Sequence, residues 1–455
     1  MNDSIPDDPR TTRIDDGWSN PAAESVHRRV FVKGAAWAVP VVAVSLATPA
    51  AAASGSPTLT FTEASYRGSA CTAITGVQVS RTTDGSTADA GKTITVTLKD
   101  GYTFAGGKTT YSGTTDSKEL LTLPDITVPA DGGTSRFGAS SDSLSTSAPV
   151  SAPASTAARN HQWNTSDGGA VEDYPNIPKD SKAVGYGFFL TPDNELWWKT
   201  RKTAIAKSVT SAVGEHVDST TADYVTYTTA DGNFQWDTTG EDGTLETYPK
   251  IPKKSKAVGY GFFLTPDNEL WWKKRETAIA TNVTSAVGEH VDSTMADYVT
   301  YTTADGNYQW NSADGGTLDT FPNIAKNSKA VGYGFFLTPD NELWWKTQET
   351  AVAKNVTSAV GEHVDSTMAD YATLTTADGN YQWKSGGKEG TLTTFAKVPS
   401  NSKAVGYGFF LTPDKELWWK TRESAVAKNV TSAVGEHGDS SMADYATYTT
   451  EPSCS

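Results

Sequence analysis

Short stretches in which apolar and polar residues alternate run along much of the chain, with turn-forming residues between them. In residues 93–98 the sequence Thr-Ile-Thr-Val-Thr-Leu alternates strictly, so Ile94, Val96 and Leu98 share one face of a strand. Glycine-containing turn signals follow this stretch and separate it from further short apolar runs. The pattern predicts short strands over residues 56–147, and short strands with frequent turns favour a β-sandwich.

A longer pattern begins at Lys182 and returns three times. The string Lys-Ala-Val-Gly-Tyr-Gly-Phe-Phe-Leu-Thr-Pro-Asp starts at Lys182, Lys256, Lys329 and Lys403, at spacings of 74, 73 and 74 residues. Each copy continues to a tryptophan pair, at Trp197-Trp198, Trp271-Trp272, Trp344-Trp345 and Trp418-Trp419. Repeats of this kind indicate an architecture built by stacking one structural unit.

Each long repeat contains two related halves. In the first repeat, residues 183–198 and residues 212–236 both read as Ala-Val-Gly, then a strand, then an Asp-containing turn, then a strand that ends in tryptophan. A short fourth stretch closes each half, at residues 204–209 and 245–251. Four short antiparallel strands form one blade of a β-propeller, and the chain holds eight such units.

The ends of the repeat region predict a closed ring. The last unit stops after two strands, near Thr450, while residues 159–178 match the third and fourth strands of the same kind of unit. Joined, these two ends complete an eighth blade and leave no exposed edge strand. We therefore expect an all-β protein, with a closed β-propeller of about eight short four-stranded blades over residues 159–455 and a sandwich before it.

The repeat unit resembles that of the regulator of chromosome condensation propellers. The shared features are an Ala-Val-x-x-Gly strand, a strand that ends in Thr, an Asp-Gly turn and a strand with Trp, and the resemblance covers residues 159–450. It implies a propeller; family members usually have seven blades, and secreted bacterial members include an inhibitor of beta-lactamases. The chain departs from the pattern because Trp is followed by Lys, Asp or Asn instead of Gly. Residues 54–147 look like a bacterial immunoglobulin-like domain, although no specific motif carries that likeness.

The first part of the chain has the order of an export signal. Arg28-Arg29 precedes an apolar run over residues 35–46, and small residues follow at 50–53. This order predicts a signal peptide over residues 1–53, and the paired arginines resemble the twin-arginine class. The alternative is a membrane anchor, but the run is shorter than the ~20 residues that a spanning helix needs. We expect a secreted or cell-wall-associated protein without a transmembrane segment in the mature chain, and an Ala/Pro/Ser-rich linker over residues 148–158.

Composition narrows the range of partners. The net charge of −15 gives no basic footprint for nucleic acid. Of the two cysteines, Cys71 lies in the expected sandwich and Cys454 is the penultimate residue, and neither has a metal-ligand spacing. After export the two cysteines are expected to pair, because a free exposed thiol is reactive outside the cell. The alternative is two unpaired thiols in flexible segments.

The tryptophan pairs have two interpretations. Neighbouring residues of a strand face opposite sides, so each member of a pair can pack against a different neighbouring blade. The alternative is that a tryptophan near a strand end stacks on a sugar ring. We favour the packing interpretation for most of the twelve tryptophans of the ring.

The second-type halves carry a recurring Glu-His-x-Asp sequence that the first-type halves lack. We expect it in a loop that projects from one face of the ring at every second blade, as a candidate ligand-binding site. Its residues are Glu215, His216, Asp218, Glu289, His290, Asp292, Glu362, His363, Asp365, Glu436, His437 and Asp439. The alternative is a polar connecting loop that was duplicated with its repeat. We expect no metal and no cofactor, because the spacing matches no metal-ligand motif.

Nothing in the repeats indicates catalysis. The copies are nearly identical, so no blade has a unique acid, base or nucleophile, and motifs of hydrolases and phosphate loops are missing. We expect a non-enzymatic, monomeric binding scaffold that recognises an extracellular glycan or partner protein at several equivalent sites. The alternatives are an inhibitor-like protein that grips one partner enzyme across the ring face, and a propeller hydrolase.

Overall fold

The computed structural model describes residues 55–153, 159–217, 222–387, 389–438, 443–452 and 454. This part of the chain consists of strands with a few single 3-10 turns, which confirms the all-β class. Within it, no helix is long and apolar enough to cross a membrane. The signal peptide expected over residues 1–53 lies outside the described residues and stays a prediction.

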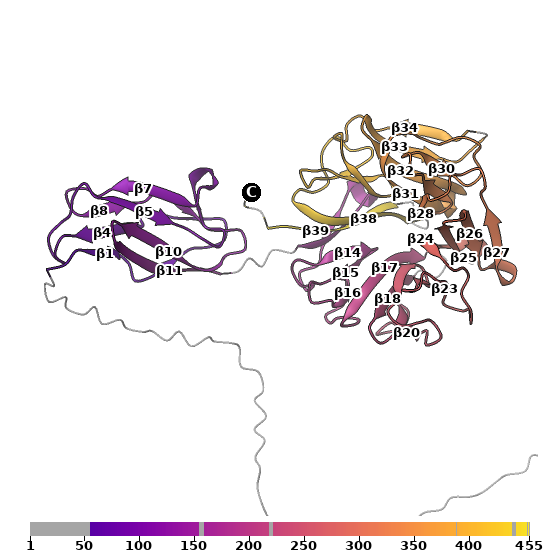
Figure 1. Cartoon of the computed structure of the whole chain (residues 1–455), viewed down its shortest axis with the longest axis horizontal. Coiled ribbons are helices and arrows are strands. Elements are labelled where there is room, and N and C mark those ends of the chain that lie inside the picture. Colours follow the sequence, from indigo (N-terminus) through magenta and orange to yellow (C-terminus); the bar gives the residue numbers. More distant parts are fainter. Residues whose placement is uncertain are drawn as a thin grey trace, which may run out of the picture. The chain divides into compact units, whose positions relative to one another are not determined.

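A β-sandwich occupies residues 58–152 (Figure 1). One sheet has the order β2 (Tyr66–Arg67), β11 (Leu144–Ala152), β10 (Gly133–Ser141), β5 (Thr93–Thr97) and β7 (Thr110–Thr114). Two smaller sheets contain β1 (Thr58–Phe61), β4 (Gln78–Thr82) and β8 (Leu120–Thr122), and β3 (Ala73–Ile74), β9 (Ile126–Thr127) and β6 (Thr103–Phe104). The sheets enclose one apolar core that includes Ile94, Val96 and Leu98, as the alternation predicted. The immunoglobulin-like assignment stays a prediction.

The linker expected over residues 148–158 is wrong for its first half. Strand β11 continues to Ala152, which pairs with Gly133 of β10. Ala148, Val150 and Ala152 point into the sandwich core, and the residues between them face outward. The strand alternates in the usual way, but with side chains so small that the segment has the composition of a linker.

Residues 160–450 form eight groups of antiparallel strands, arranged as a propeller-like ring with the first strand of most groups around its centre (Figure 1). Single parallel bridges, between Gly332 and Gly361 and between Gly406 and Gly435, join two pairs of neighbouring groups into seven-stranded sheets. Four groups have three strands: β14 (Lys182–Gly185), β15 (Phe188–Leu190) and β16 (Leu196–Trp198); β21 (Lys256–Gly259), β22 (Phe262–Leu264) and β23 (Leu270–Trp272); β28 (Lys329–Gly332), β29 (Phe335–Leu337) and β30 (Leu343–Trp345); β35 (Lys403–Gly406), β36 (Phe409–Leu411) and β37 (Leu417–Trp419).

The other four groups have four strands. They are β17 (Val209–Val217), β18 (Ala222–Thr229), β19 (Asn233–Asp237) and β20 (Thr244–Thr247); β24 (Val283–Val291), β25 (Ala296–Thr303), β26 (Asn307–Asn311) and β27 (Thr317–Thr320); β31 (Val356–Val364), β32 (Ala369–Thr376), β33 (Gly379–Lys384) and β34 (Thr391–Thr394); β38 (Val430–Gly438), β39 (Ala443–Thr450), β12 (Asn160–Asn164) and β13 (Val171–Asp173). Below, each group of three or four strands is called a blade.

The expectation of four strands in every blade is wrong for the first-type halves. In the first of them, the fourth stretch makes only an isolated bridge between Ala206 and Leu196. The short chain between Trp198 and Val209 must return to the centre of the ring, because Val209 already begins the next inner strand. Long and short blades therefore alternate around the ring.

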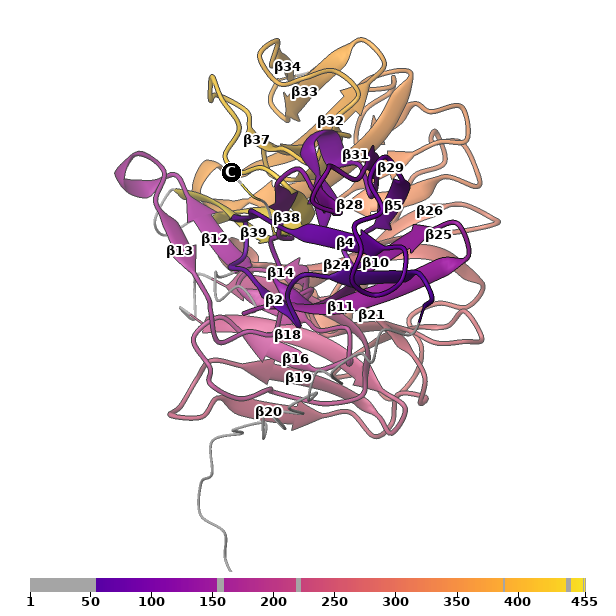
Figure 2. The same cartoon turned by 90° about the vertical axis from the view of Figure 1, so that its left-hand side faces the viewer.

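The ring closes as the two incomplete ends predicted. Strand β12 pairs with β39, from Asn160 opposite Thr449 to Asn164 opposite Tyr445. Figure 2 shows β13, β12 and β39 side by side in this closing blade. The N-terminal end of the repeat region thus supplies the outer half of the last blade, and the C-terminal end supplies the inner half.

Neighbouring inner strands approach so closely that glycine is required. Gly259 of β21 has φ +138°, and a Cβ atom there would lie 2.0 Å from the carbonyl oxygen of Gly288 in β24. Any side chain would collide with backbone, which cannot move aside. The same contact recurs at Gly185, Gly332 and Gly406, which explains the Gly after Ala-Val in the first-type halves. In the second-type halves, a Cβ atom at Gly288 would instead lie 2.4 Å from the ring of Phe262.

The tryptophan pairs pack between blades, which confirms the core interpretation. Trp198 belongs to a cluster with Val209 and Trp236 of the following blade. Its neighbour Trp197 packs against a second cluster, which contains Tyr174 of the preceding blade. The two members of a pair therefore bury their rings on opposite sides of their own blade.

Cys71 and Cys454 form a disulfide, as the sequence analysis expected. The bond joins the sandwich to the chain that follows β39, across a sequence separation of 383 residues. The sandwich is already linked to β12 through the main chain. Strands β12 and β39, whose pairing closes the ring and which we call the seam, are therefore both attached to the sandwich.

Removing the disulfide should weaken the fold. Replacing both cysteines (Cys71→Ser with Cys454→Ser) releases the C-terminal end and restores freedom to the unfolded chain, and we expect a loss of about 2–5 kcal/mol in the free energy of unfolding. Urea denaturation of the variant and of the wild type, with and without reductant, measures this loss. Reduced wild type serves as the matched control. Equal unfolding midpoints for the variant and the oxidised wild type would contradict the expected role.

Candidate functional site

The Glu-His pairs expected in an exposed loop lie at the ends of the long inner strands. Glu215 and His216 belong to β17, because the strand continues through Glu-His-Val. The equivalent pairs are Glu289-His290 in β24, Glu362-His363 in β31 and Glu436-His437 in β38. Asp292 and Asp365 begin the 3-10 turns η4 (Asp292–Thr294) and η6 (Asp365–Thr367), and Asp218 and Asp439 lie outside the described residues. The loop placement of the Glu-His pairs is therefore wrong.

Each histidine takes part in a polar network between blades, shown best by His290. Its Nδ1 lies 2.7 Å from Oδ1 of Asp297, and the indole N–H of Trp272 donates to Oδ2 of the same aspartate at 2.7 Å. The His290 and Asp297 side chains are only 9% and 7% exposed. Burial alone would lower the pKa of His290, but hydrogen bonds to Asp292 and Asp297 raise it to about 9. The two aspartates therefore stabilise the protonated form of this buried histidine.

A buried lysine completes the network. Nζ of Lys273 lies 3.9 Å from Oδ2 of Asp297 and 3.6 Å from the centre of the Tyr260 ring, and it donates to Gln235 at 2.9 Å. Burial lowers the pKa of Lys273 to about 8, although Asp297 opposes this shift. The Tyr260 ring in turn packs 4.9 Å from the ring of His290. Lys346 and Lys420 occupy equivalent positions over Tyr333 and Tyr407.

The glutamates link one long blade to the next across a short blade. Oε1 of Glu215 accepts a hydrogen bond from the backbone N–H of His290 at 2.8 Å, and Glu289 accepts one from His363 at 2.7 Å. Burial raises the pKa of Glu215 to about 7 and that of Glu289 to about 8, the latter with a contribution from the charge of Glu215. Burial and neighbouring glutamates also raise the pKa of Glu362 and Glu436. The four carboxyl groups therefore influence one another around the ring.

This geometry assigns the Glu-His pairs an internal role. Their side chains hydrogen-bond and stack between blades, so they hold the ring together. In the described part of the chain, no group of three or more His, Cys, Asp or Glu residues is placed to hold a metal ion. The ligand-binding role expected for these residues stays a prediction. The opposite end of each long blade, where the turn between the second and third strands lies, has a different surface.

At that end, a buried asparagine shapes a small cavity. Asn233 follows the turn between β18 and β19 and is 1% exposed. Its side-chain NH2 donates to the carbonyl oxygens of Ile251 and Pro252, both at 3.0 Å. The backbone carbonyl oxygen of Asn233 accepts a hydrogen bond from the backbone N–H of Tyr248 at 2.9 Å. These bonds hold the segment after β20 beside the turn, with a gap between the two.

The gap is lined by aromatic, polar and charged residues. The cavity beside Asn233 has a volume of about 160 Å³, and its lining includes Phe234, Tyr248, Asp231 and Lys253. The half-buried Phe234 ring stacks on Tyr227, with ring centres 5.1 Å apart. One wall therefore offers an aromatic ring that is fixed from behind, and other walls offer hydrogen-bonding groups.

The same cavity recurs in the next long blade. There the volume is about 200 Å³, and Tyr308 stacks on Tyr301 at 5.1 Å while Asn307 donates to Ile324 and Ala325. In the third long blade, Asn380 makes the same two bonds, to Val398 and Pro399, and Tyr381 occupies the aromatic position. We call the two cavities, together with the equivalent place beside Asn380, the turn pockets; the structure describes a cavity at the first two, and at the third Tyr381 lies opposite Leu374 instead of a second aromatic ring. The Asp-Gly-Asn stretch was expected only to form a turn, although the aromatic residue that follows it in each of these three copies was a usable signal.

The closing blade differs at the equivalent place. Asn160 makes the same bonds, to Ile177 and Pro178, but Arg159 replaces the glycine of the turn and His161 replaces the aromatic residue. Arg159 is buried and pairs with Asp131 of the sandwich. The seam has therefore been adapted for attachment to the sandwich, whereas the other three long blades keep the turn pocket.

Comparisons with known proteins give no name to the fold. No family model matches the chain, and no curated protein matches it. Similar solved structures include a quinonprotein alcohol dehydrogenase-like protein from Bacteroides thetaiotaomicron, with 10% identity, a TM-score of 0.27, and coverage of 72% of this chain and 92% of the other. An auxiliary nutrient binding protein from Bacteroides ovatus has 10% identity and a TM-score of 0.31, with 87% and 98% covered. Dihydro-heme d1 dehydrogenase NirN has 10% identity and a TM-score of 0.30, with 61% and 75% covered. These scores are too low to carry an argument about function.

The buried glutamates and histidines should make stability fall as pH rises from 5 to 8. Because the pKa values of Glu215 and Glu289 are raised, the folded state keeps protons that the unfolded chain releases near pH 4.5. The contribution of these two groups to the free energy of unfolding is therefore full below pH 4.5 and is lost as the pH approaches 7 to 8. His290 adds a change of the same sign above pH 6.5. Urea denaturation at each pH measures the free energy of unfolding.

The variant Glu289→Gln tests the source of this dependence. It keeps an oxygen acceptor for His363 but cannot titrate, so we expect the pH-dependent change in stability to shrink by about 2 kcal/mol. The surface change Glu241→Gln is the control and should leave the slope unchanged. A stability that rises between pH 5 and 8 in the wild type would show the opposite linkage and contradict the buried-acid account.

Proposed function

We propose that this protein is a secreted, non-enzymatic binding scaffold that recognises sugar residues of an extracellular glycan through its turn pockets. The observation that carries the proposal is the recurrence of one cavity at equivalent positions of the long blades. Its volumes, about 160 and 200 Å³, lie below the ~300–1,000 Å³ typical of pockets for drug-sized ligands. Each pocket is therefore suited to a single ring rather than to a larger molecule.

The lining of the turn pockets supports a sugar ring as the ligand. The aromatic faces of Phe234 and Tyr308 are suited to the C–H face of a pyranose, and each is held in place by stacking on a second ring. Asp231 and Lys253 line the first pocket, and Asp305 and Lys326 line the second, so each pocket offers both acceptors and donors for sugar hydroxyls.

Repetition around the ring supports multivalent binding. Two similar weak sites, with a third place of equivalent sequence beside Tyr381, gain affinity for a polymer that presents the same sugar many times. A catalytic site would need unlike groups that converge, whereas these blades repeat the same residues. The disulfide agrees with an oxidising compartment outside the cytosol. The export signal and the relation to chromosome condensation regulators are parts of the same proposal.

Truncating the aromatic walls tests this function. We expect each of Phe234→Ala, Tyr308→Ala and Tyr381→Ala to weaken binding to a glycan polymer by about tenfold, and the triple variant to abolish it, because each removes one stacking face. A glycan array with the whole protein identifies the sugar, and calorimetry with wild type and variants measures the affinities. The control is Leu245→Ala, which truncates an exposed residue of β20 outside the turn pocket. Full binding by a folded triple variant would refute the assignment.

A further inference from the structure

The outer face of the five-stranded sheet in the sandwich is covered almost entirely by hydroxyl groups. The strand registers place Ser147, Gly138 and Thr97 in one row across β11, β10 and β5. The next row contains Ser145, Ser140 and Thr95. Nothing described of the ring uses this face, and the fold of the sandwich does not require hydroxyls there, because the core lies on the other side of the sheet.

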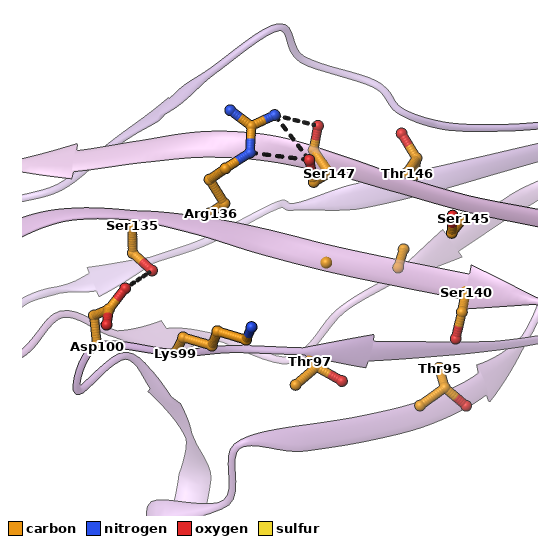
Figure 3. Close-up of a pocket in the computed structure, with 12 residues that line it drawn as sticks. Thr95, Thr97, Lys99, Asp100, Ser135, Arg136, Ser140, Ser145, Thr146 and Ser147 are labelled. Carbon is orange, nitrogen blue, oxygen red and sulfur yellow. Dashed lines mark hydrogen bonds between the residues drawn. The ribbon is translucent and has the colours of Figure 1, made fainter.

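The middle of this face is hollow because Gly138 has no side chain. Every residue next to it in the two rows carries one. A Cβ atom added at Gly138 would meet only the carbonyl oxygen of Thr97, at 3.8 Å. The resulting groove has a volume of about 670 Å³, within the ~300–1,000 Å³ of ligand pockets, and Figure 3 shows its lining. At Gly138, a ligand could lie against the sheet without displacing a side chain.

Two cations border the groove. Nε and Nη2 of Arg136 donate to the Ser147 hydroxyl at 3.0 and 2.8 Å, which fixes the guanidinium and leaves Nη1 outside these bonds. Lys99 lies on the other side in Figure 3. The nearby carboxylate of Asp100 accepts a hydrogen bond from Ser135 at 2.7 Å. The groove therefore carries two cations and one anion, although the net charge of the whole chain is −15.

We propose that this groove binds an acidic glycan through its carboxylate groups, with a uronic-acid oligosaccharide as the ligand class. Nη1 of this guanidinium, which is held in one orientation by Ser147, can donate a charge-assisted hydrogen bond to a carboxylate oxygen of the ligand. The serine and threonine hydroxyls around Gly138 both donate and accept, as the hydroxyls of a sugar chain require. No aromatic residue lines the groove, so it lacks the stacking face of the turn pockets. The site is therefore separate from those pockets in position and in ligand chemistry, and it does not depend on them.

Filling the hollow provides a sharp test. The variant Gly138→Thr places a side chain in open space and suits a strand, so the fold should be at least as stable as the wild type. Calorimetry of the whole protein with oligogalacturonate should show binding by the wild type, with an affinity that falls as salt rises. We expect Gly138→Thr and Arg136→Gln each to weaken that binding by about tenfold or more, because one removes the space and the other the charge.

Matched controls make each outcome decisive. Ser112→Thr keeps the hydroxyl that hydrogen-bonds to Thr95 and adds one methyl group at an outward position of β7 that does not line the groove, so it should bind normally. The triple turn-pocket variant should also keep its affinity for oligogalacturonate, which separates this proposal from the proposed function of the ring. Maltohexaose, a neutral chain, should not bind to the groove. Equal binding of poly(glycerol phosphate) would replace the carboxylate assignment with a general anion site. No binding by the wild type, or full binding by both folded groove variants, would overturn the proposal.

Discussion

The antiparallel pairing of β12 with β39 is the contact on which the rest of the ring depends. It brings together residues from the two ends of the repeat region and turns a row of blades into a circle. One kind of hydrogen bond crosses every border between a long blade and the short blade that follows it. The Ser211 hydroxyl accepts from the backbone N–H of Ala257 at 2.8 Å, and the Ser432 hydroxyl of the closing blade accepts from the backbone N–H of Ala183 in the first short blade at 2.8 Å. Because the border after the closing blade repeats the geometry of the other borders, each inner strand that the structure describes has a neighbour on both sides.

Closure also explains why so many polar groups are buried at one end of the long blades. Glu215 and Glu289 each accept a hydrogen bond from the backbone of the next long strand, so their bonds follow one another around the ring. Such bonds need a partner on both sides, which only a closed ring supplies. The aspartates and lysines behind them are satisfied within the same borders. The polar residues that look most like a ligand site therefore belong to the framework, and the binding sites that we propose lie elsewhere, at the turn pockets and on the hydroxyl-covered sheet.

Much of this architecture could be predicted from the sequence because it follows from matching segments. Two partial units that complete each other predict a closed ring, and two cysteines without a metal spacing predict the disulfide. Other features depend on three-dimensional packing that a linear pattern does not contain. From the sequence, Val209 could belong to the fourth strand of its own half or to the inner strand of the next half. It belongs to the inner strand because the chain must return to the ring centre before the next blade begins. The strand ending at Ala152 has a linker's composition, and the groove at Gly138 exists only because its neighbours on other strands carry side chains.

The closed seam is tested most directly by amide hydrogen exchange followed by mass spectrometry. The comparison is between residues 160–164, which form the strand added from the N-terminal end, and residues 233–237, which form the equivalent strand inside the first long blade. The account predicts similar protection of the two segments in the oxidised protein, since both pair on each side within a four-stranded blade. If residues 160–164 exchange as fast as the exposed turn at residues 239–243 while residues 233–237 stay protected, the ring is open and the account is wrong.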